Sequence, residues 1–421
     1  MPSPGSTPTD ERIARVRITP VSSATSGCAR LGVVRFLHTS DWHVGRAIRG
    51  RTRVTEFSDA LDEVVGIATQ EGVDTVLLAG DIYDHRSPAP EADALVFETL
   101  VRLHEAGIRV VAIPGNHDSA LRLEALAKLL APIGTTMVPR VVPPERGSLV
   151  ELIARDGHEQ ALVACVPFVP ERRFGDAARL FDATEAWYLN YAEGLGRLLD
   201  AMADPFRDDR VNVLMAHLFT DGAIPGGGEH TITIGIEYAI SPSRLPATAS
   251  YIALGHVHRP QAVRGAPAPT RYAGSLLQLD FGERDQRKSV TIVDASPGKP
   301  AKVREVRLSS GRPLVDVEGT LDEVIRLGEE SPDAYLRVFV LTDGPVPGIA
   351  ERIRDALPNA VDVSLKYERV EASDHGVPLS SLQPRDQFVS YHTRQHGVDR
   401  VPEELMAAFD EVLDDLGHEV S

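Results

Sequence analysis

The chain alternates between short apolar runs and longer stretches in which apolar residues recur at the helical period. The apolar runs span residues 34–38, 76–78, 109–113, 211–215 and 251–254. Each run is followed within a few residues by Gly, Asp or His, which is typical of a buried strand that ends in a sharp turn. Helical patterns with one apolar face span residues 56–68, 91–105 and 121–130. This alternation predicts an α/β fold whose parallel strands are joined by helical crossovers.

The second half of the chain continues this pattern and then changes character. We expect a strand at 161–166 and a helix at about 186–202. Beyond Pro260, two alternating runs at 288–293 and 302–308 suit a second sheet. A β-α-β-α-β unit follows, with strands near Leu314 and at 335–341 and 360–365, and helices at 321–327 and 349–357. This unit contains no cluster of metal-ligand residues, so we interpret it as a separate accessory domain.

These patterns divide the chain into five parts. Residues 1–32 are rich in Pro, Ser, Thr and Gly and predict a disordered tail, with a translation start nearer Val33 left open. The main α/β domain spans 33–310, the accessory domain 311–370 and a polar linker 371–383. The last part, 384–421, predicts two short helices, each with apolar residues on one face.

Composition narrows the class of protein. The 421 residues include 44 basic and 61 acidic side chains, which give a formal net charge of −17. A broad basic face for nucleic acid would show the opposite balance, so such a partner must be held by a local cluster or by bound cations. Two cysteines, Cys28 and Cys165, cannot make a disulfide framework. No apolar run approaches the ~20 residues that span a bilayer, and the N-terminus lacks the apolar segment of a secretory signal. We expect a reduced, cytoplasmic protein that does not enter a membrane.

Seven residues with metal-binding side chains follow the predicted strands. They are Asp41, His43, Asp81, Asn116, His217, His256 and His258. Open α/β sheets bind their ligands at the carboxyl ends of the strands, and all seven follow strands of one inferred parallel sheet. A lone histidine at a strand end is more often satisfied by the backbone than bound to a metal. Seven such residues in one register predict a metal site.

The number and type of these residues indicate two ions. Seven ligands exceed the four of a tetrahedral zinc site. They suit two ions that share a bridging carboxylate, about 3.5–4 Å apart, and clamp the attacking and leaving oxygens of a phosphoryl transfer. Imidazole ligands argue against magnesium. A mixed set of His, Asp and Asn fits manganese, iron or zinc.

The motifs that carry these residues are specific in combination. They are Asp41-x-His43, Gly80-Asp81-x-x-Asp84, Gly115-Asn116-His117-Asp118, His217 and Gly255-His256-x-His258. This set resembles the calcineurin-like metallophosphoesterase superfamily. The flanking segments 38–45, 255–261 and 274–283 closely resemble the SbcD family of bacterial nuclease subunits. The resemblance runs from about Val34 to the C-terminus and implies a two-sheet α/β sandwich with a small capping domain and a C-terminal helical tail.

The resemblance also implies an activity and partners. It implies a manganese-dependent DNA nuclease of repair, recombination and replication that cleaves duplex ends, hairpins and single strands. Such a nuclease works with SbcC, an ATPase with a long coiled coil, and forms a homodimer within a heterotetramer. Carried over by motif, the first ion takes Asp41, His43, Asp81 and His258. The second takes Asp81, Asn116, His217 and His256, so that Asp81 bridges the two.

The same carry-over gives catalytic roles to two residues that are not metal ligands. His117 is expected to contact the scissile phosphate or to protonate the leaving oxygen. Asp118 is expected to orient His117, as carboxylates commonly orient imidazoles. The chain departs from the family at Pro225-Gly226-Gly227-Gly228, where relatives usually carry a more polar, Ser-rich loop.

Two further groups are candidates for contacts with partners. Arg46, Arg49, Arg51 and Arg53 lie just after the first ligand pair and predict phosphate contacts, with a solvated loop as the alternative. Apolar residues of the terminal helices predict docking into a partner helix, which the resemblance identifies as the base of the SbcC coiled coil. They are Phe388, Tyr391, Leu405, Phe409 and Val412. The alternative is that these helices fold back on the accessory domain.

Two other classes of function stay open. A stand-alone phosphodiesterase or phosphatase would share the two-metal core but would need no partner-binding tail. A non-enzymatic scaffold would be expected to lose ligands, whereas every expected ligand position is filled here.

Overall fold

The computed structural model describes residues 32–170, 191–229, 239–367, 383–396 and 400–418. The predicted N-terminal tail lies almost entirely outside these residues, as do most of the linker and the first residues of the helix predicted at 186–202. The chain forms two compact units. One comprises Met1–Thr342 with Val346–Lys366, and the other comprises Asp343–Pro345 with Tyr367–Ser421.

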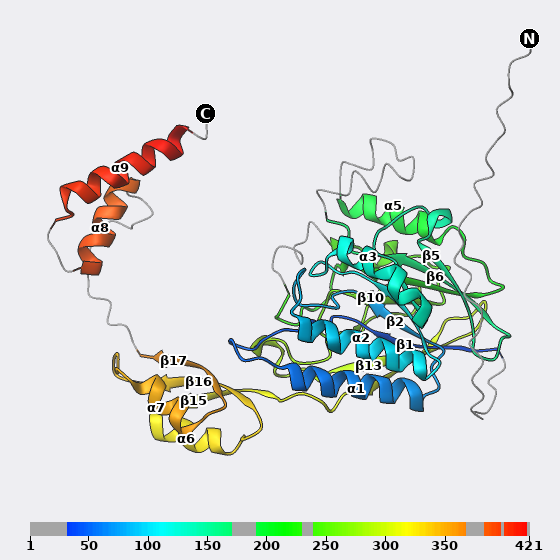
Figure 1. Ribbon diagram of the computed structural model, residues 1–421, viewed down its shortest axis with the longest axis horizontal. Coiled ribbons are helices and arrows are strands. Elements are labelled where there is room, and N and C mark those ends of the chain that lie inside the picture. The colour runs from blue at the N-terminus through cyan, green and yellow to red at the C-terminus, as the bar shows by residue number, and fades with distance from the viewer. Residues whose placement is uncertain (1–31, 171–190, 230–238, 368–382, 397–399, 419–421) are drawn as a thin grey trace, which may run out of the picture. The chain divides into compact units, whose positions relative to one another are not determined.

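Two six-stranded sheets form the body of the first unit (Figure 1). The first sheet contains, in spatial order, β14 (Lys302–Arg307), β13 (Ser289–Ala295), β1 (Val34–Thr39), β2 (Thr75–Ala79), β3 (Arg109–Ile113) and β4 (Thr135–Met137). The second contains β11 (Gln261–Ala262), β12 (Thr270–Tyr272), β10 (Tyr251–Gly255), β7 (Val211–His217), β6 (Gln160–Val166) and β5 (Leu149–Ile153). A two-stranded sheet of β8 (Phe219–Thr220) and β9 (Ala239–Ile240) lies beyond β7 in the chain.

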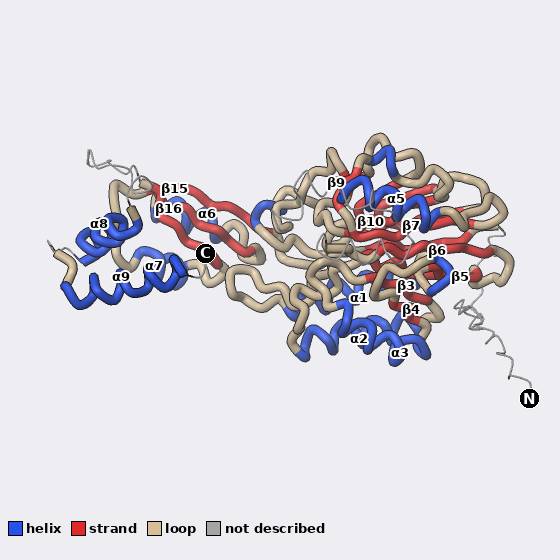
Figure 2. Tube along the Cα trace, turned by 90° about the horizontal axis from the view of Figure 1, so that it is seen from above, coloured by secondary structure: helices blue, strands red, loops and turns tan. Residues whose placement is uncertain are grey.

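Helices cover the outer faces of both sheets. The first sheet is covered by α1 (Val54–Gln70), α2 (Pro90–Glu105) and α3 (Ala120–Leu130), and α5 (Tyr191–Ala203) lies on the opposite side of the molecule, over the second sheet (Figure 2). Residues typical of helix N-termini mark the starts of α2 and α3, close to the starts predicted from the sequence. Pro90 occupies the first turn of α2, and the Ser119 side chain caps α3 by accepting the backbone N–H of Arg122.

The core has three layers because successive strand residues point to opposite faces of the sheet. In β2, Val76 and Leu78 pack against the helices, whereas Leu77 and Ala79 pack against the second sheet. Cys165 lies in the layer between the sheets and is fully buried. Because these strands are buried on both faces, they appear in the sequence as continuous apolar runs.

The strand pairing corrects two predictions made from residue pattern alone. The ligand-bearing strands do not belong to one parallel sheet, because β1, β2 and β3 lie in the first sheet and β7 and β10 in the second. The pair β13–β14 does not start a second sheet either, since β13 pairs antiparallel with β1 and extends the first. The two-sheet sandwich implied by the family resemblance is confirmed.

The accessory β-α-β-α-β pattern is also present. Its parallel sheet contains β15 (Leu314–Gly319), β16 (Tyr335–Leu341) and β17 (Ala360–Lys366), with helices α6 (Leu321–Glu329) and α7 (Ile349–Ala356). We call residues 311–366 the capping domain. It belongs to the same compact unit as the sandwich and has an apolar core of its own. Short 3₁₀ turns occur at Ala131–Ile133, Pro144–Arg146, Pro242–Arg244 and, as η6, at Phe281–Glu283.

The second unit contains two helices, α8 (Pro384–His396) and α9 (Glu403–His418). They pack on each other, because the rings of Phe388 and Phe409 stack with centroids 4.1 Å apart. Arg385 forms an ion pair with Asp410 at 2.9 Å. Tyr391 and Leu405 stay exposed, and the side chain of Val412 lies outside the described residues. No helix in the described part of the chain is long and apolar enough to span a bilayer.

Candidate metal centre

The seven predicted ligands meet between the carboxyl ends of strands from both sheets. Three groups of side chains each bring their ligand atoms within 4.8 Å of one another. The groups are Asp41, His43 and His258; His43, Asp81 and His117; and Asp81, His217 and His256. The Asn116 carbonyl oxygen joins the third group, 3.1 Å from His217 Nε2 and 2.9 Å from His256 Nδ1. Residues up to 217 positions apart in the sequence (Asp41 to His258) therefore form one cluster.

The backbone is strained where it presents these ligands. Asp41, His43 and Asp81 have φ values of 49°, 46° and 50°, and His256 has 102°. Non-glycine residues rarely adopt positive φ, and such strain concentrates at functional sites. Four of the five non-glycine residues with positive φ in the described chain belong to the predicted ligand set. This coincidence supports the assignment of the cluster as a functional site.

Two glycines let the backbone approach the ligands closely. A Cβ atom at Gly115 would overlap the Asp81 carboxylate, and one at Gly255 would overlap the carbonyl oxygen of Ala79. Only glycine fits such close approaches. The Gly-Asn-His-Asp and Gly-His motifs thus include glycine because two strand ends and a carboxylate share one small space.

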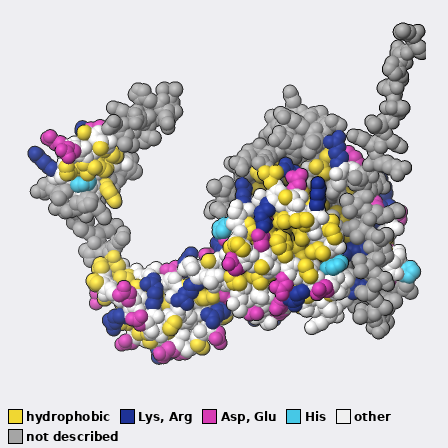
Figure 3. All heavy atoms as spheres, viewed as in Figure 1, with side chains coloured by type: hydrophobic (Ala, Val, Ile, Leu, Met, Phe, Trp, Pro, Cys, Tyr) yellow, Lys and Arg dark blue, Asp and Glu magenta, His cyan; other side chains and the backbone are white. Residues whose placement is uncertain are grey.

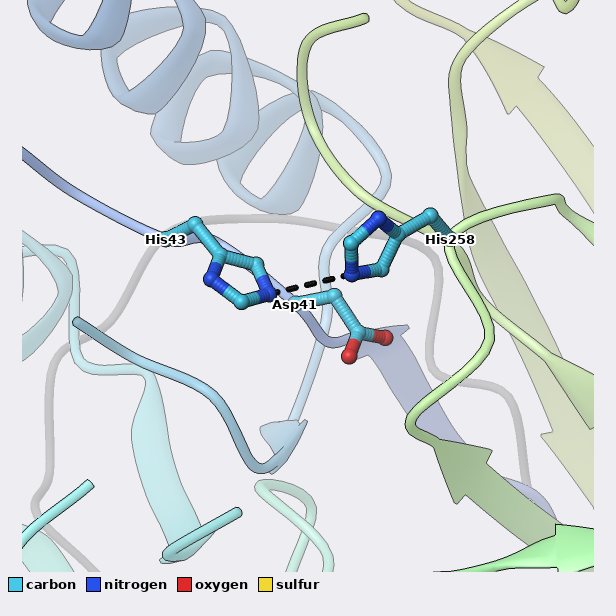
Figure 4. A group of neighbouring side chains, drawn as sticks. All are labelled: Asp41, His43 and His258. Atoms are coloured by element: carbon cyan, nitrogen blue, oxygen red, sulfur yellow. Dashed lines mark hydrogen bonds between the residues drawn. The ribbon is translucent and has the colours of Figure 1, made fainter. Parts of the chain in front are cut away.

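Hydrogen bonds on the outer side fix the tautomers of two histidines. The Nδ1–H of His217 donates to the Ala79 carbonyl at 2.8 Å, and that of His258 to Glu283 Oε1 at 2.9 Å. Their Nε2 lone pairs consequently point into the cluster. Nε2 of His258 lies 3.1 Å from Nε2 of His43 (Figure 4), and Nε2 of His217 lies 3.3 Å from Nδ1 of His256. Converging lone pairs are satisfied by a cation, so the donor set fits bound metal ions.

Asp81 lies between the two histidine groups. Its Oδ2 is 3.5 Å from His43 Nε2 and 3.4 Å from His217 Nε2, while Oδ1 accepts the backbone N–H of His117. Burial raises the pKa of this carboxyl, but His217 and His43 outweigh burial and hold the pKa well below its usual value. An ionised carboxylate between two imidazole groups is the arrangement that a shared ligand requires.

Asp84 supports the cluster from outside, a role that was not predicted from the sequence. Its carboxylate lies 3.4 Å from His43 Nδ1 and 3.1 Å from the Arg46 guanidinium. Burial raises the pKa of Asp84, but the hydrogen bond with His43 and the Arg46 charge together lower it to about 2. The position of Asp84 as the second aspartate of the Gly80-Asp81-x-x-Asp84 motif could have indicated this role.

Glu283 is the second residue whose role was not predicted, although it closes one of the motifs that carry the resemblance. Its side chain is fully buried and holds His258 through Oε1, while Oε2 accepts Lys288 Nζ at 2.7 Å and the Leu279 N–H at 3.0 Å. Burial raises the pKa of Glu283, but Lys288 and His258 outweigh burial and leave the carboxylate ionised. Carboxylates in this position orient metal-binding histidines and raise their basicity.

The structure gives Asp118 a different contact from the one predicted. Its carboxylate accepts the backbone N–H groups of Ile82, Tyr83 and Gly115 at 2.9–3.1 Å. The ring of His117 instead contacts the backbone carbonyl of Asp84 through Nδ1 at 2.9 Å. Burial and the charge of Asp81 raise the pKa of Asp118 to about 6. Asp118 therefore ties two ligand loops together, and Asp84 supplies the contact that orients His117.

The glycine-rich loop at 225–228 packs directly against the cluster. Glu229 accepts the N–H groups of Gly226, Gly227 and His258 at 2.6–2.8 Å. A Cβ atom at Gly228 would lie 2.7 Å from Glu283 Oε1 and 3.0 Å from the His258 ring. Cβ atoms at Gly226 and Gly227 would also lie within 3.0 Å of His258 and Gly282, which accounts for the run of glycines.

The four predicted phosphate-binding arginines are in different environments. Arg53 is 2% exposed and forms two hydrogen bonds with Glu56 inside the protein, so it does not belong to an exposed cluster. Arg46 pairs with Asp84, and Arg49 pairs with Asp362 at 3.0 Å. Arg51 is exposed. On the face in view in Figure 3, Lys and Arg side chains of the capping domain alternate with Asp and Glu and form no field of one sign.

Comparisons with known proteins agree with this geometry. Residues 34–260 match the family model described as calcineurin-like phosphoesterase, and residues 310–396 match the one described as type 5 capsule protein repressor C-terminal domain. The chain is 32% identical to the SbcD subunit of nuclease SbcCD from Bacillus subtilis, over 92% of this chain and 99% of that protein. It is 30% identical to the Escherichia coli K12 protein of the same name, over 84% and 92% of the two chains, and 30% identical to that of Rhodobacter capsulatus, over 77% and 84%.

Proposed function

We propose that this chain, which belongs to the SbcD family of calcineurin-like phosphoesterases and is a metal-dependent nuclease subunit, hydrolyses DNA at duplex ends, hairpins and single strands. The observation that carries the proposal is the placement of Asp81 between two groups of histidines. Divalent ions fit these donors, and we propose manganese because the set mixes imidazole, carboxylate and amide oxygen.

The ligands divide into two sets around Asp81. Asp41, His43 and His258 would hold one ion with Asp81, and Asn116, His217 and His256 the other. Two bound ions supply positive charge that lowers the pKa of water and stabilises the oxygens of a phosphoryl group in transfer. Asp84 and Glu283 keep the rings of His43 and His258 in position from outside.

His117 is the residue that we propose acts on the leaving group. The Asp84 carbonyl accepts a hydrogen bond from Nδ1, which fixes the orientation of the ring. Nε2 would then donate a proton to the leaving ribose oxygen, a step that contributes about 10²–10⁴ in rate when the acid is well positioned. Asp118 acts on the loop rather than on the ring, since its oxygens accept backbone N–H groups on both sides of the site.

The relatives are named as subunits of a two-component nuclease, SbcCD. We extend this to an assembly of two copies of the chain with an SbcC-type coiled-coil ATPase, and we propose a cytoplasmic location because DNA is the substrate. The exposed side chains of Tyr391 and Leu405 support docking of α8 and α9 on a partner helix, because two short helices leave them uncovered.

The test is a nuclease assay on duplex DNA labelled at the 5′ or 3′ end, with manganese or EDTA, and with and without the coiled-coil ATPase. Asp81→Asn serves as the inactive control, and a small aryl phosphodiester serves as the general substrate. We expect the wild-type chain to cleave DNA in the presence of manganese and the Asp81→Asn variant not to cleave it. Hydrolysis of the aryl substrate without cleavage of any DNA would instead identify a stand-alone phosphodiesterase.

A further inference from the structure

We propose that the capping domain controls the geometry of the metal centre through η6, the turn Phe281–Glu283. One end of this turn holds the metal ligand His258, and the other is inserted in the contact with the capping domain. Displacement of the capping domain would therefore loosen one ligand. The inference rests on the proposed function only in assuming that metal is bound by these residues.

The end of η6 toward the metal centre is held rigidly. Glu283 binds His258 through one oxygen, and its other oxygen accepts from Lys288 and from the backbone of Leu279. Lys288 Nζ also donates to the His258 carbonyl at 2.9 Å. The side chain and the backbone of one histidine are thus both fixed by the buried Glu283–Lys288 pair.

The other end of η6 lies in the contact with the capping domain. The Phe281 ring is fully buried in a cluster with Ile48 of the main domain and with Leu314 and Tyr335, which belong to β15 and β16 of the capping sheet. The guanidinium of Arg337, also on β16, lies 4.7 Å from the Phe281 ring centroid. Each of these capping-domain contacts is made two residues away from Glu283.

The turn between these ends is too short to absorb a displacement. The Asp280 side chain caps it by accepting the N–H of Gly282 at 3.0 Å, and the Asp280 carbonyl accepts the N–H of Glu283 at 2.8 Å. A Cβ atom at Gly282 would lie 3.1 Å from the Cα atom of Gly227. Because packed turns shift as units, movement of Phe281 moves the carboxylate that orients His258.

The test compares Phe281→Ala, Glu283→Gln and the matched control Phe339→Ala. Phe339 lies on β16 against Arg337 and Lys366 and outside the cluster around Phe281. Binding of Mn²⁺ to metal-free protein is measured by titration calorimetry, and folding by thermal unfolding. We expect Phe281→Ala and Glu283→Gln to weaken the binding of one ion by about 10–100-fold, as supporting residues of metal sites do. Phe339→Ala should leave both affinities unchanged.

The outcomes separate the coupling from the nuclease activity. If Glu283→Gln weakens metal binding and Phe281→Ala does not, the link to the capping domain is wrong. If neither variant changes the affinity, Glu283 does not position His258. Phe281→Leu, which restores apolar volume, should recover most of the affinity lost in Phe281→Ala. If destabilisation of the capping domain were enough to weaken metal binding, Phe339→Ala would lose affinity as well, and the link through Phe281 would be wrong. None of these readouts requires that the protein cleave DNA.

A separate observation points to a site for phosphate groups. A cavity of about 320 Å³ lies between the start of β13, the end of β14 and the segment that enters the capping domain. Its lining includes the cations Arg287, Lys288, Arg307 and Arg312 and no carboxylate. We infer that this cavity binds the phosphate backbone of a nucleic-acid strand, which gives the acidic nuclease subunit proposed above a local cationic site.

Among the described residues, three of the four cations in this cavity have no acidic partner, in contrast to Arg46, Arg49 and Arg53, which are paired with carboxylates. No carboxylate in the described part of the chain pairs with the guanidinium groups of Arg287, Arg307 or Arg312. Lys288 is neutralised by Glu283. The N–H groups of Ser309 and Ser310 are occupied by Glu63, so the three arginine side chains must supply the contacts. Guanidinium groups suit phosphate because their planar donors match its oxygens.

The test measures binding of a labelled oligothymidine to protein in EDTA by fluorescence anisotropy over a range of salt concentrations. The variant combines Arg287→Ser, Arg307→Ser and Arg312→Ser. The charge-matched control combines Arg197→Ser, Arg244→Ser and Arg326→Ser, whose side chains pair with acids elsewhere. We expect only the first variant to lower the log–log salt slope, by about 2 units for three single-strand phosphate contacts.

Equal slopes in both variants would overturn the assignment of the cavity. Manganese-dependent hydrolysis of a small aryl phosphodiester, which needs no backbone contact, should be unchanged in the cavity variant. If the wild-type chain itself did not hydrolyse the aryl phosphodiester, that result would count against the proposed function and not against the cavity.

Discussion

The Nε2 atoms of His43 and His258 lie 3.1 Å apart, although 215 positions separate the two residues in the chain. His43 follows β1 of the first sheet, and His258 follows β10 of the second. Their outer nitrogens lie near two buried carboxylates, Asp84 and Glu283. Each sheet thus contributes an imidazole to the candidate metal centre, while the supporting acids lie outside the strands, Asp84 after β2 and Glu283 in η6.

Asp81→Ala should abolish activity and lower the metal content at both positions. Asp81 is the residue that the geometry places between the two histidine groups, and its loss would leave two cations without the charge that separates them. Metal analysis of the purified variant checks this, with the exposed Asp62→Ala as control. Two ions still bound per chain would contradict the bridging role.

His117→Ala should keep both ions and fold normally while the rate falls by about 10²–10⁴, the contribution of a positioned acid. Turnover at saturating manganese and metal content are measured on the same sample. The possible ligand atoms of His117, His43 and Asp81 lie within 4.8 Å of one another. Loss of one ion in this variant would therefore identify His117 as a ligand.

Arg53→Ser and Arg51→Ser should differ sharply. Arg53 is buried and paired with Glu56 at 2.7 Å, and removing one partner of a buried pair costs about 3–5 kcal/mol. Arg51 is exposed, so its replacement should change stability little. Denaturant unfolding of both variants checks the contrast. Equal stability would mean that the Arg53–Glu56 pair contributes nothing to the fold.

The contact between the main and capping domains should weaken in acid. Burial raises the pKa of Glu56, but hydrogen bonds from Arg53, Arg312 and Tyr335 outweigh burial and hold the pKa below its usual 4.5. A lowered pKa contributes stability that is present above pH 4.5 and is lost as the pH falls through the folded-state pKa. Wild type should therefore melt above Glu56→Gln at pH 6, and the difference should shrink below pH 4.5. A difference independent of pH would exclude this carboxylate as its source.

Truncation after Ser380 should leave hydrolysis of a small phosphodiester intact, because α8 and α9 belong to the second compact unit. The same truncation should abolish co-purification with the coiled-coil ATPase. Replacing the exposed Tyr391 and Leu405 with Ser should weaken assembly without removing the Phe388–Phe409 stack. Assembly at unchanged affinity would disprove docking through these helices.

The sequence by itself determined most elements and predicted the side chains that meet in the candidate metal centre. The run 109–113 is β3 to the residue, and the helical pattern at 91–105 is α2 to within one residue. Apolar periodicity is a local property that burial imposes on every strand and helix, so it can be read without knowledge of neighbours. The candidate ligands could be recognised equally well, because Asp, Asn and His after strand ends are conspicuous in a sequence.

The tertiary structure alone decided which elements and side chains meet. β13 pairs with β1 across some 255 positions, and no local pattern distinguishes an extension of the first sheet from the start of a second. Arg53 looks like its neighbours in the sequence, yet Glu56 and the capping domain bury it. Asp118 and His117 are adjacent in the chain, but Asp118 is held by the backbone of another loop. Long-range packing determines partners because the free energy of a polar contact depends on what burial places beside it.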